Sequence, residues 1–113
     1  MKYNTRYAIS VLNNRYRGAL ISESVRVSVF DQISSLLENR LLPVTENTQL
    51  IGGESVLNSM KLVELSLSLE DKAAEIGFEF DWTSEAAMSR SRSMFGTAGS
   101  LATEFIRQME SKR

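Results

Sequence analysis

Residues 58–77 read NSMKLVELSLSLEDKAAEIG. Apolar residues recur in this stretch at intervals of three and four positions, which is the period of an α-helix. They are Leu62, Leu65, Leu69, Ala73 and Ile76. Gly77 is a typical C-terminal stop, because glycine adopts the left-handed conformation that often ends a helix. We therefore predict a helix from Ser59 to Ile76 whose apolar stripe faces the core.

The opposite side of this predicted helix mixes apolar and acidic residues. The apolar residues are Met60, Val63, Leu67 and Ala74, and the acids are Glu64, Glu70 and Asp71. Acids can steer a basic partner while aliphatic side chains supply buried area on contact, so this pattern is typical of a docking surface. Alternatively, another part of the chain covers Val63 and Leu67.

Three further helices are predicted from apolar periodicity. They span about Ser22–Arg40, Thr83–Arg90 and Thr97–Met109. The expected N-cap of the first is Ser22 or Ser24, and that of the second is Thr83 or Ser84. The residues between helices include a long loop over 42–58 and a polar linker, Ser-Arg-Ser-Arg-Ser, over 89–93. The predicted fold class is all-α.

Aromatic residues alternate with polar ones directly after the predicted helix over 59–76. Phe78, Phe80 and Trp82 are separated by Glu79 and Asp81. This extended signal is too short and isolated to make a sheet. We expect a loop whose aromatic side chains fill the core, and the alternative is that they line a pocket.

Length and composition narrow the functional classes. The chain has 113 residues, which fits one domain, and contains neither cysteine nor histidine. Cysteine nucleophiles and Ser-His-Asp triads are therefore excluded, and a zinc site is not expected. No apolar run approaches the roughly 20 residues that span a bilayer, and the N-terminus lacks a secretory signal pattern. We expect a cytoplasmic protein that is not an enzyme.

Charge is distributed unevenly along the chain. Residues 1–17 carry a net charge of +4, whereas residues 22–89 carry four basic residues against twelve acids, or −8. An acidic body repels nucleic acid and suits partners with basic docking surfaces. We divide the chain into a basic N-terminal extension, 1–20, and a domain, 21–113. The extension is interpreted as an extra helix or arm resting on the body, with a partner-contact arm and a membrane-surface helix as alternatives.

Ser59 lies where the loop over 42–58, which contains Gly52 and Gly53, meets the predicted helix over 59–76. The simplest interpretation is an N-cap, the commonest use of serine at a helix start. An exposed hydroxyl at this place is also accessible to a modifying enzyme. Free backbone N–H groups and the positive end of the helix would favour a phosphodiester there.

Several short motifs resemble the acyl carrier protein family, in its stand-alone bacterial form. The family pattern is a glycine-containing loop, Asp-Ser-Leu, then Val-Glu-Leu four residues after the serine and Leu-Glu six residues further on. The matching stretches here are GESVLNSM (53–60), VEL (63–65), LE (69–70), IGFEF (76–80) and FGTAGSL (95–101). The resemblance covers about residues 22–110, with each motif short and the ordered spacing more specific.

This resemblance implies a four-helix, acyl-carrier-like bundle of three longer helices and a short third one. It also implies that Ser59, flanked by Asn58 and Met60, receives phosphopantetheine from coenzyme A through a phosphopantetheinyl transferase. The chain would then carry acyl or aminoacyl thioesters to ligases, acyltransferases or synthases. Glu54, Val63, Glu64, Leu67, Glu70 and Asp71 would contact these partners.

Two departures from the family pattern bear on this implication. Asn58 stands where the family has an acid, which removes a negative charge beside the modified hydroxyl, and Met60 replaces an aliphatic residue. The alternatives are an unmodified interaction module with the carrier fold, which Asn58 favours, and a hydrolase using Glu54 and Glu64. We expect a monomer with no nucleic acid and no stable membrane insertion.

Overall fold

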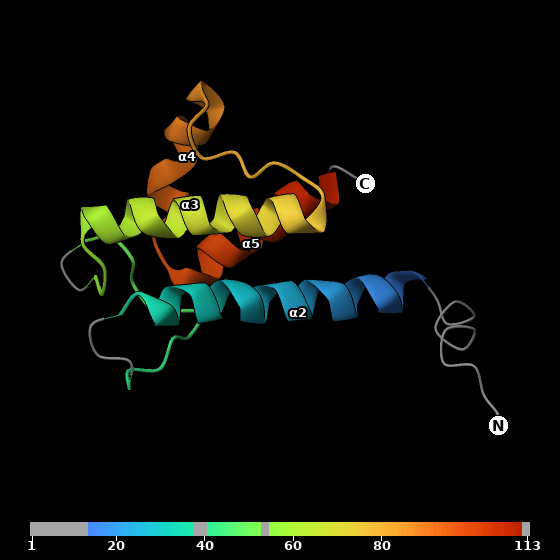
Figure 1. Ribbon diagram of the computed structural model, residues 1–113, viewed down its shortest axis with the longest axis horizontal. Helices are drawn as coiled ribbons and strands as arrows, with labels where there is room; N and C mark the ends of the chain where they lie inside the picture. Colours follow the sequence, from blue (N-terminus) through green and yellow to red (C-terminus); the bar gives the residue numbers. More distant parts are fainter. Residues whose placement is uncertain (1–13, 38–40, 53–54, 112–113) are drawn as a thin grey trace.

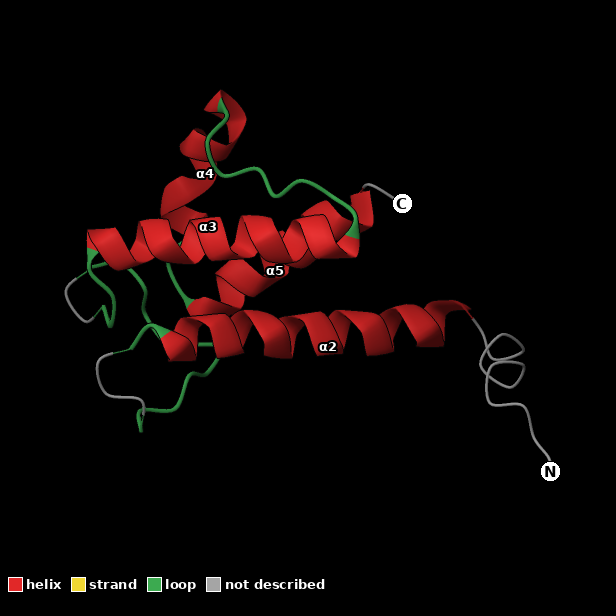
Figure 2. Ribbon diagram, in the orientation of Figure 1, coloured by secondary structure: helices red, strands yellow, loops and turns green. Residues whose placement is uncertain are grey.

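The computed structural model describes residues 14–37, 41–52 and 55–111, with the side chains described from residue 21 onward. These residues form four helices and no strand (Figures 1 and 2). The helices are α2 (Asn14–Ser35), α3 (Ser59–Ile76), α4 (Glu85–Met94) and α5 (Ala98–Ser111). The all-α prediction is therefore confirmed.

Helices α2 and α3 run in opposite directions, with α5 passing obliquely behind them and the short α4 standing steeply above α3 (Figure 1). Helix α2 contacts both α3 and α5, and α4 contacts α5. The core between them is built from residues spaced four apart on each long helix. These residues include Val25, Val29 and Ile33 of α2, Leu65, Leu69 and Ala73 of α3, and Leu101, Phe105 and Met109 of α5.

Helix α3 has the predicted bounds. Gly77 ends it at φ 112°, in the left-handed region, and its N–H donates to the Ala73 carbonyl at 2.8 Å. The predicted apolar stripe is confirmed at Leu65, Leu69 and Ala73, but not at Ile76, which is 38% exposed. The helix ends there, and the chain turns so that Phe78 enters the core instead.

Helix α2 begins and ends earlier than predicted. It starts at Asn14 and continues without a break across the proposed boundary at residue 20, so neither Ser22 nor Ser24 is its N-cap. The Ser22 hydroxyl instead donates to Glu110 of α5 at 3.2 Å. Ala19, Leu20 and Ile21 directly precede Ser22 and are compatible with a helix, so the poor helix former Gly18 does not end it. Residues 1–13 of the predicted basic extension lie outside the described residues.

The predicted polar linker at 89–93 is wrong, because these residues belong to α4. Three serines there donate their hydroxyls to the backbone carbonyl three residues earlier, at 2.8–3.0 Å: Ser89, Ser91 and Ser93. These local bonds satisfy the polar side chains within the helix. The buried Ala87 and Met94 then anchor α4 to the core. Ser84 is the N-cap, as one of the two predicted alternatives.

Helix α5 begins one residue later and ends two residues later than predicted. Thr97 and Ser100 bond reciprocally at its start, since each backbone N–H donates to the other's hydroxyl at 3.0–3.1 Å. This arrangement satisfies two donors that a helix N-terminus leaves free.

The aromatic loop after α3 packs as predicted at two of its three positions. Phe78 and Phe80 are buried, and their ring centroids lie 5.1 and 5.2 Å from that of Phe105. Trp82 is only half-buried. The three phenylalanines therefore fix the loop onto α5, and Trp82 remains at the surface of this cluster.

A polar network on α5 holds both the aromatic loop and α4. Glu104 accepts two hydrogen bonds from Arg107, at 2.8 and 2.7 Å, one from Gln108 at 2.9 Å and one from Arg90 of α4 at 3.3 Å. Buried Gln108 also pairs with the backbone of Asp81, accepting at 2.7 Å and donating at 2.9 Å. The hydrogen bond from Arg107, helped by Gln108 and by the charges of Arg107 and Arg90, outweighs desolvation and lowers the pKa of Glu104 to about 2.

Replacement of Phe105 by alanine should lower the free energy of unfolding by about 3–5 kcal/mol, because the ring is fully buried and contacts two other rings. Urea unfolding checks this. Val27→Ala is the control, since Val27 is 50% exposed and its loss should cost no more than about 0.5 kcal/mol. Equal effects of the two substitutions would show that the core is misplaced.

Glu104 should make the free energy of unfolding depend on pH in the acidic range. Its folded pKa lies below the ordinary value of 4.5, so its contribution is present above about pH 4.5 and is lost as the pH falls towards 2. At pH 7, Glu104→Gln should cost about 1.5 kcal/mol or more, and the gap to the wild type should close as the pH approaches 2. Urea unfolding from pH 7 to pH 2.5 measures it. The exposed Glu75→Gln is the control, and a Glu104 gap that is constant with pH would contradict the network.

Candidate functional site

The N-terminus of α3 is capped by Asn58. The Asn58 side chain accepts a hydrogen bond from the Lys61 backbone N–H at 2.8 Å, and its carbonyl accepts from the Leu62 N–H at 3.0 Å. The interpretation of Ser59 as the N-cap is therefore wrong, because Asn58 takes that position and Ser59 is the first helical residue. Asparagine and aspartate cap equally well, so Asn58 keeps the helix start and removes only the charge.

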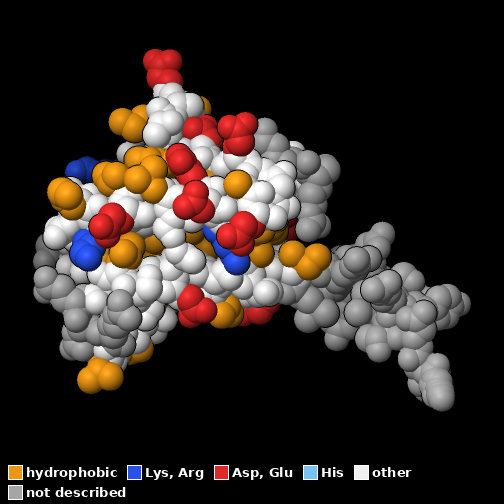
Figure 3. Space-filling model, in the orientation of Figure 1, with side chains coloured by type: hydrophobic (Ala, Val, Ile, Leu, Met, Phe, Trp, Pro, Cys, Tyr) orange, Lys and Arg blue, Asp and Glu red, His pale blue; other side chains and the backbone are white. Residues whose placement is uncertain are grey.

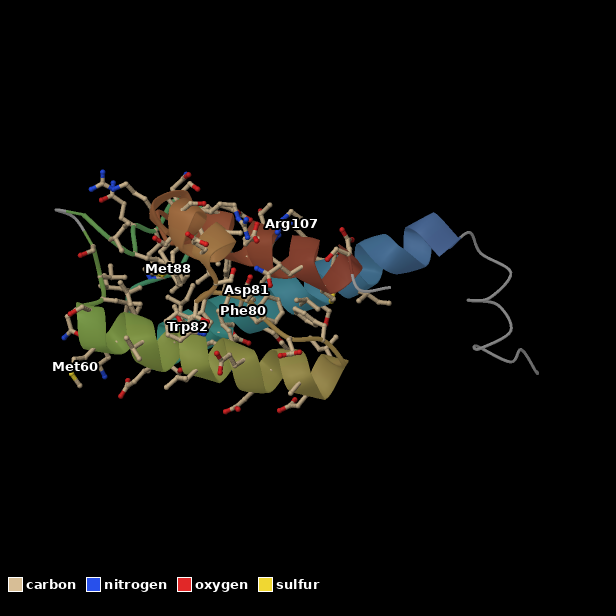
Figure 4. The ribbon with its side chains drawn as sticks, turned by 90° about the horizontal axis from the view of Figure 1, so that it is seen from above. Met60, Phe80, Asp81, Trp82, Met88 and Arg107 are labelled. Carbon is tan, nitrogen blue, oxygen red and sulfur yellow. The ribbon has the colours of Figure 1, made fainter. Side chains whose placement is uncertain are left out.

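Ser59 is exposed, and no described residue hydrogen bonds to its hydroxyl. Its neighbour Met60 is 75% exposed and lies in the first turn of α3, where its side chain points away from the bundle (Figure 4). The first backbone N–H groups of a helix lack intrahelical partners and carry partial positive charge. The Ser59 oxygen thus combines access from solvent with surroundings that favour an attached anion.

An apolar cavity of about 330 Å³ lies between α3 and α4, starting one helical turn after Ser59. Its lining comes from α3, α4, the aromatic loop and the loop before α3. The lining residues are Ile51, Leu62, Val63, Ser66, Trp82, Met88, Ser91, Arg92 and Phe95. In Figure 4, Trp82 and Met88 lie between the two helices. A cavity of this size and character suits a small apolar ligand.

Most of the cavity lining was not predicted from the sequence. The α4 residues were missed because half of that helix was interpreted as a linker. Ser66 was missed because the prediction of buried positions followed apolar residues only. It is nevertheless 1% exposed, and its hydroxyl donates to the Leu62 carbonyl at 2.9 Å. Trp82 was considered for either core or pocket, and its ring borders the pocket.

The outer face of α3 is exposed as predicted. Met60, Val63 and Leu67 are 75%, 48% and 50% exposed. Val63 also borders the cavity between α3 and α4. Acidic and hydrophobic side chains alternate over this part of the surface (Figure 3). We call this set, with Glu64, Glu70 and Asp71, the acidic–apolar face.

The three acids of the acidic–apolar face differ in their surroundings. Glu64 lies 3.8 Å from the Lys61 ammonium, a weak surface pair. Glu70 accepts a hydrogen bond from the Trp82 indole N–H at 2.6 Å. Asp71 is exposed and forms no ion pair with a described residue. Glu54, also predicted to contact partners, lies outside the described residues.

Comparison with known protein families, with curated proteins and with solved structures finds no match to this chain. The resemblance to acyl carrier proteins thus stays a prediction. Within the described residues, no group of acids could hold a metal ion, and no helix is long and apolar enough to cross a membrane.

Asn58→Ala should lower the free energy of unfolding by about 1 kcal/mol, because it removes the cap of α3. Asn58→Asp should leave stability unchanged or slightly higher, since an N-terminal negative charge complements the helix dipole. Ser59→Ala should cost little. Urea unfolding of the three variants compares these free energies. If Ser59→Ala lowers stability as much as Asn58→Ala does, the assignment of the cap to Asn58 is wrong.

Proposed function

We propose that this chain is a carrier that holds acyl or aminoacyl intermediates as thioesters on a phosphopantetheine arm attached to Ser59. The single observation that carries the proposal is the exposed hydroxyl of Ser59 in the first turn of α3, to which no described residue hydrogen bonds. A serine that capped the helix would have its oxygen occupied by a backbone N–H. Here Asn58 supplies that bond, so Ser59 is free to react without loss of helix stability.

The chemistry required of the chain at Ser59 is small. The Ser59 oxygen attacks the phosphorus atom that bears the pantetheine part of coenzyme A, the bond to the adenosine bisphosphate breaks, and the serine proton passes to a base of the transferase. The arm supplies the thiol that this cysteine-free chain lacks. The helix N-terminus stabilises the resulting phosphodiester, and the chain itself needs no catalytic residue.

The cavity beside Ser59 supports the same proposal. Leu62 and Val63 border it one turn after the attachment point, about 5 Å along the helix axis. An apolar cargo on a flexible arm could therefore be sheltered between α3 and α4. Tethering would raise the local concentration of the cargo at each partner's active site.

The acidic–apolar face supports docking of partners with basic surfaces. These are the transferase and the ligases, acyltransferases or synthases that load and use the cargo. Glu64 and Asp71 attract basic groups at long range, and Val63 and Leu67 supply apolar area on contact. Asn58 favours a second candidate, an unmodified interaction module that uses the same face, because it removes the charge beside Ser59.

The two candidates differ in a mass measurement. After co-expression with a broad-specificity phosphopantetheinyl transferase, the intact chain should gain the mass of one phosphopantetheine. Ser59→Ala should abolish the gain, whereas Ser55→Ala, in the preceding loop, should keep it. No gain with any transferase would contradict the carrier and leave the interaction module. A gain that survives in Ser59→Ala would contradict attachment at Ser59.

The docking role of the acidic–apolar face has its own test. Reversal of Glu64 and Asp71 to lysine should raise the transferase KM for this chain roughly ten-fold at low salt and flatten its salt dependence. Glu23→Lys, an exposed reversal on α2, is the matched control. Circular dichroism checks that helicity is kept. An unchanged KM and salt dependence would place the docking surface elsewhere.

A further inference from the structure

Trp82 belongs to two features at once. Its ring borders the cavity between α3 and α4, and its indole N–H donates to the Glu70 carboxylate on the acidic–apolar face at 2.6 Å. A hydrogen bond from a neutral donor to a carboxylate is short and stronger than a neutral pair. The cavity wall and the proposed docking face are therefore joined by one hydrogen bond.

The backbone around Trp82 is fixed independently of Glu70. Asp81 is held by the paired hydrogen bonds with Gln108 on α5. The Asp81 carboxylate accepts from the backbone N–H of Ser84 at 3.0 Å, and Ser84 caps α4. Hydrogen bonds of this kind also lower the pKa of Asp81, with the Ser84 hydroxyl contributing most. Since the backbone is anchored on both sides, the indole side chain is the part that can move.

Glu70 is accessible to a partner. Its side chain is exposed on the outer surface of α3, beside Asp71 and one turn from Leu67. An arginine fork binds both oxygens of a carboxylate in one plane, so it competes directly with the indole for Glu70. A partner that presents arginine to this face would thus remove the bond that orients Trp82.

We propose that the Glu70–Trp82 hydrogen bond is a latch that holds the Trp82 ring in the wall of the cavity, and that an arginine of a docking partner releases it. The proposal rests on the carrier function for the identity of the cargo, and it adds a coupling between docking and cavity access. By thermodynamic linkage the coupling is reciprocal, so an occupied cavity changes the affinity for the partner by the same factor. Partners could then distinguish a loaded chain from an empty one.

Trp82 is the only tryptophan, so its fluorescence reports the latch directly. In the unmodified full chain, Glu70→Ala should raise the acrylamide quenching constant of Trp82 at least two-fold. Glu70→Gln should give an intermediate value, because the amide oxygen still accepts but carries no charge. Asp71→Ala, its neighbour without a described ion pair, should match the wild type. An unchanged constant in Glu70→Ala, or an equal rise in Asp71→Ala, would overturn the latch.

A second measurement links the latch to the cavity. The neutral apolar dye 1-N-phenylnaphthylamine, followed by stopped-flow fluorescence, should enter the Glu70→Ala chain several-fold faster than the wild type. Trp82→Phe removes the donor, so adding Glu70→Ala to it should change the entry rate no further. Equal rates in all variants, or no dye uptake, would show that Trp82 does not control entry to the cavity.

These experiments are independent of Ser59. They use the unmodified chain, so a negative result removes the latch and leaves the carrier proposal intact. Conversely, a chain that is never modified at Ser59 would remove the carrier, while the quenching and dye measurements would still decide whether the latch exists. Circular dichroism of each variant confirms that the helices are retained.

Discussion

The hydrogen bond from the Lys61 N–H to the Asn58 side chain is the interaction on which the site depends. It sets the first residue of α3, and in doing so it places Ser59 inside the helix with its hydroxyl exposed and without a hydrogen bond from any described residue. A helix that began one residue later would use the Ser59 oxygen as its own cap and withdraw it from chemistry. The same cap fixes the register of α3, which turns Leu65 and Leu69 inward and leaves Met60 and Val63 at the surface.

The rest of the bundle holds α4 and the aromatic loop opposite α3, where they form the second wall of the cavity. The Phe105 ring packs edge-on and tilted against two rings of the aromatic loop, while Glu104 and Gln108 tie α4 and Asp81 to the same helix. Helix α5 is therefore the support from which α4 and Trp82 face α3 across the cavity. Ser59, as the proposed attachment point, the cavity and the acidic–apolar face are adjacent because all three use consecutive turns of α3.

The sequence predicts α3 well, because its apolar period, its glycine stop and its acidic outer face are all local properties. It predicts α4 poorly, because Ser-Arg alternation is typical of a linker. The serine-to-carbonyl bonds and the buried Met94 that accompany the helix have no signature in this pattern. The cavity and the Glu70–Trp82 bond depend on contacts between segments that a loop separates. No periodicity indicates such contacts, and the cap was misassigned by one residue because Asn58 and Ser59 have similar capping preferences.

Attachment of phosphopantetheine to the Ser59 hydroxyl at the start of α3 can be tested by a two-dimensional amide NMR spectrum. The spectrum is recorded on the ¹⁵N-labelled chain before and after incubation with coenzyme A, Mg²⁺ and a phosphopantetheinyl transferase. Attachment at Ser59 should give the largest amide shifts at Asn58, Ser59 and Met60, with the resonances of the later turns of α3 retained. An unchanged spectrum, or shifts centred on another segment, would contradict it.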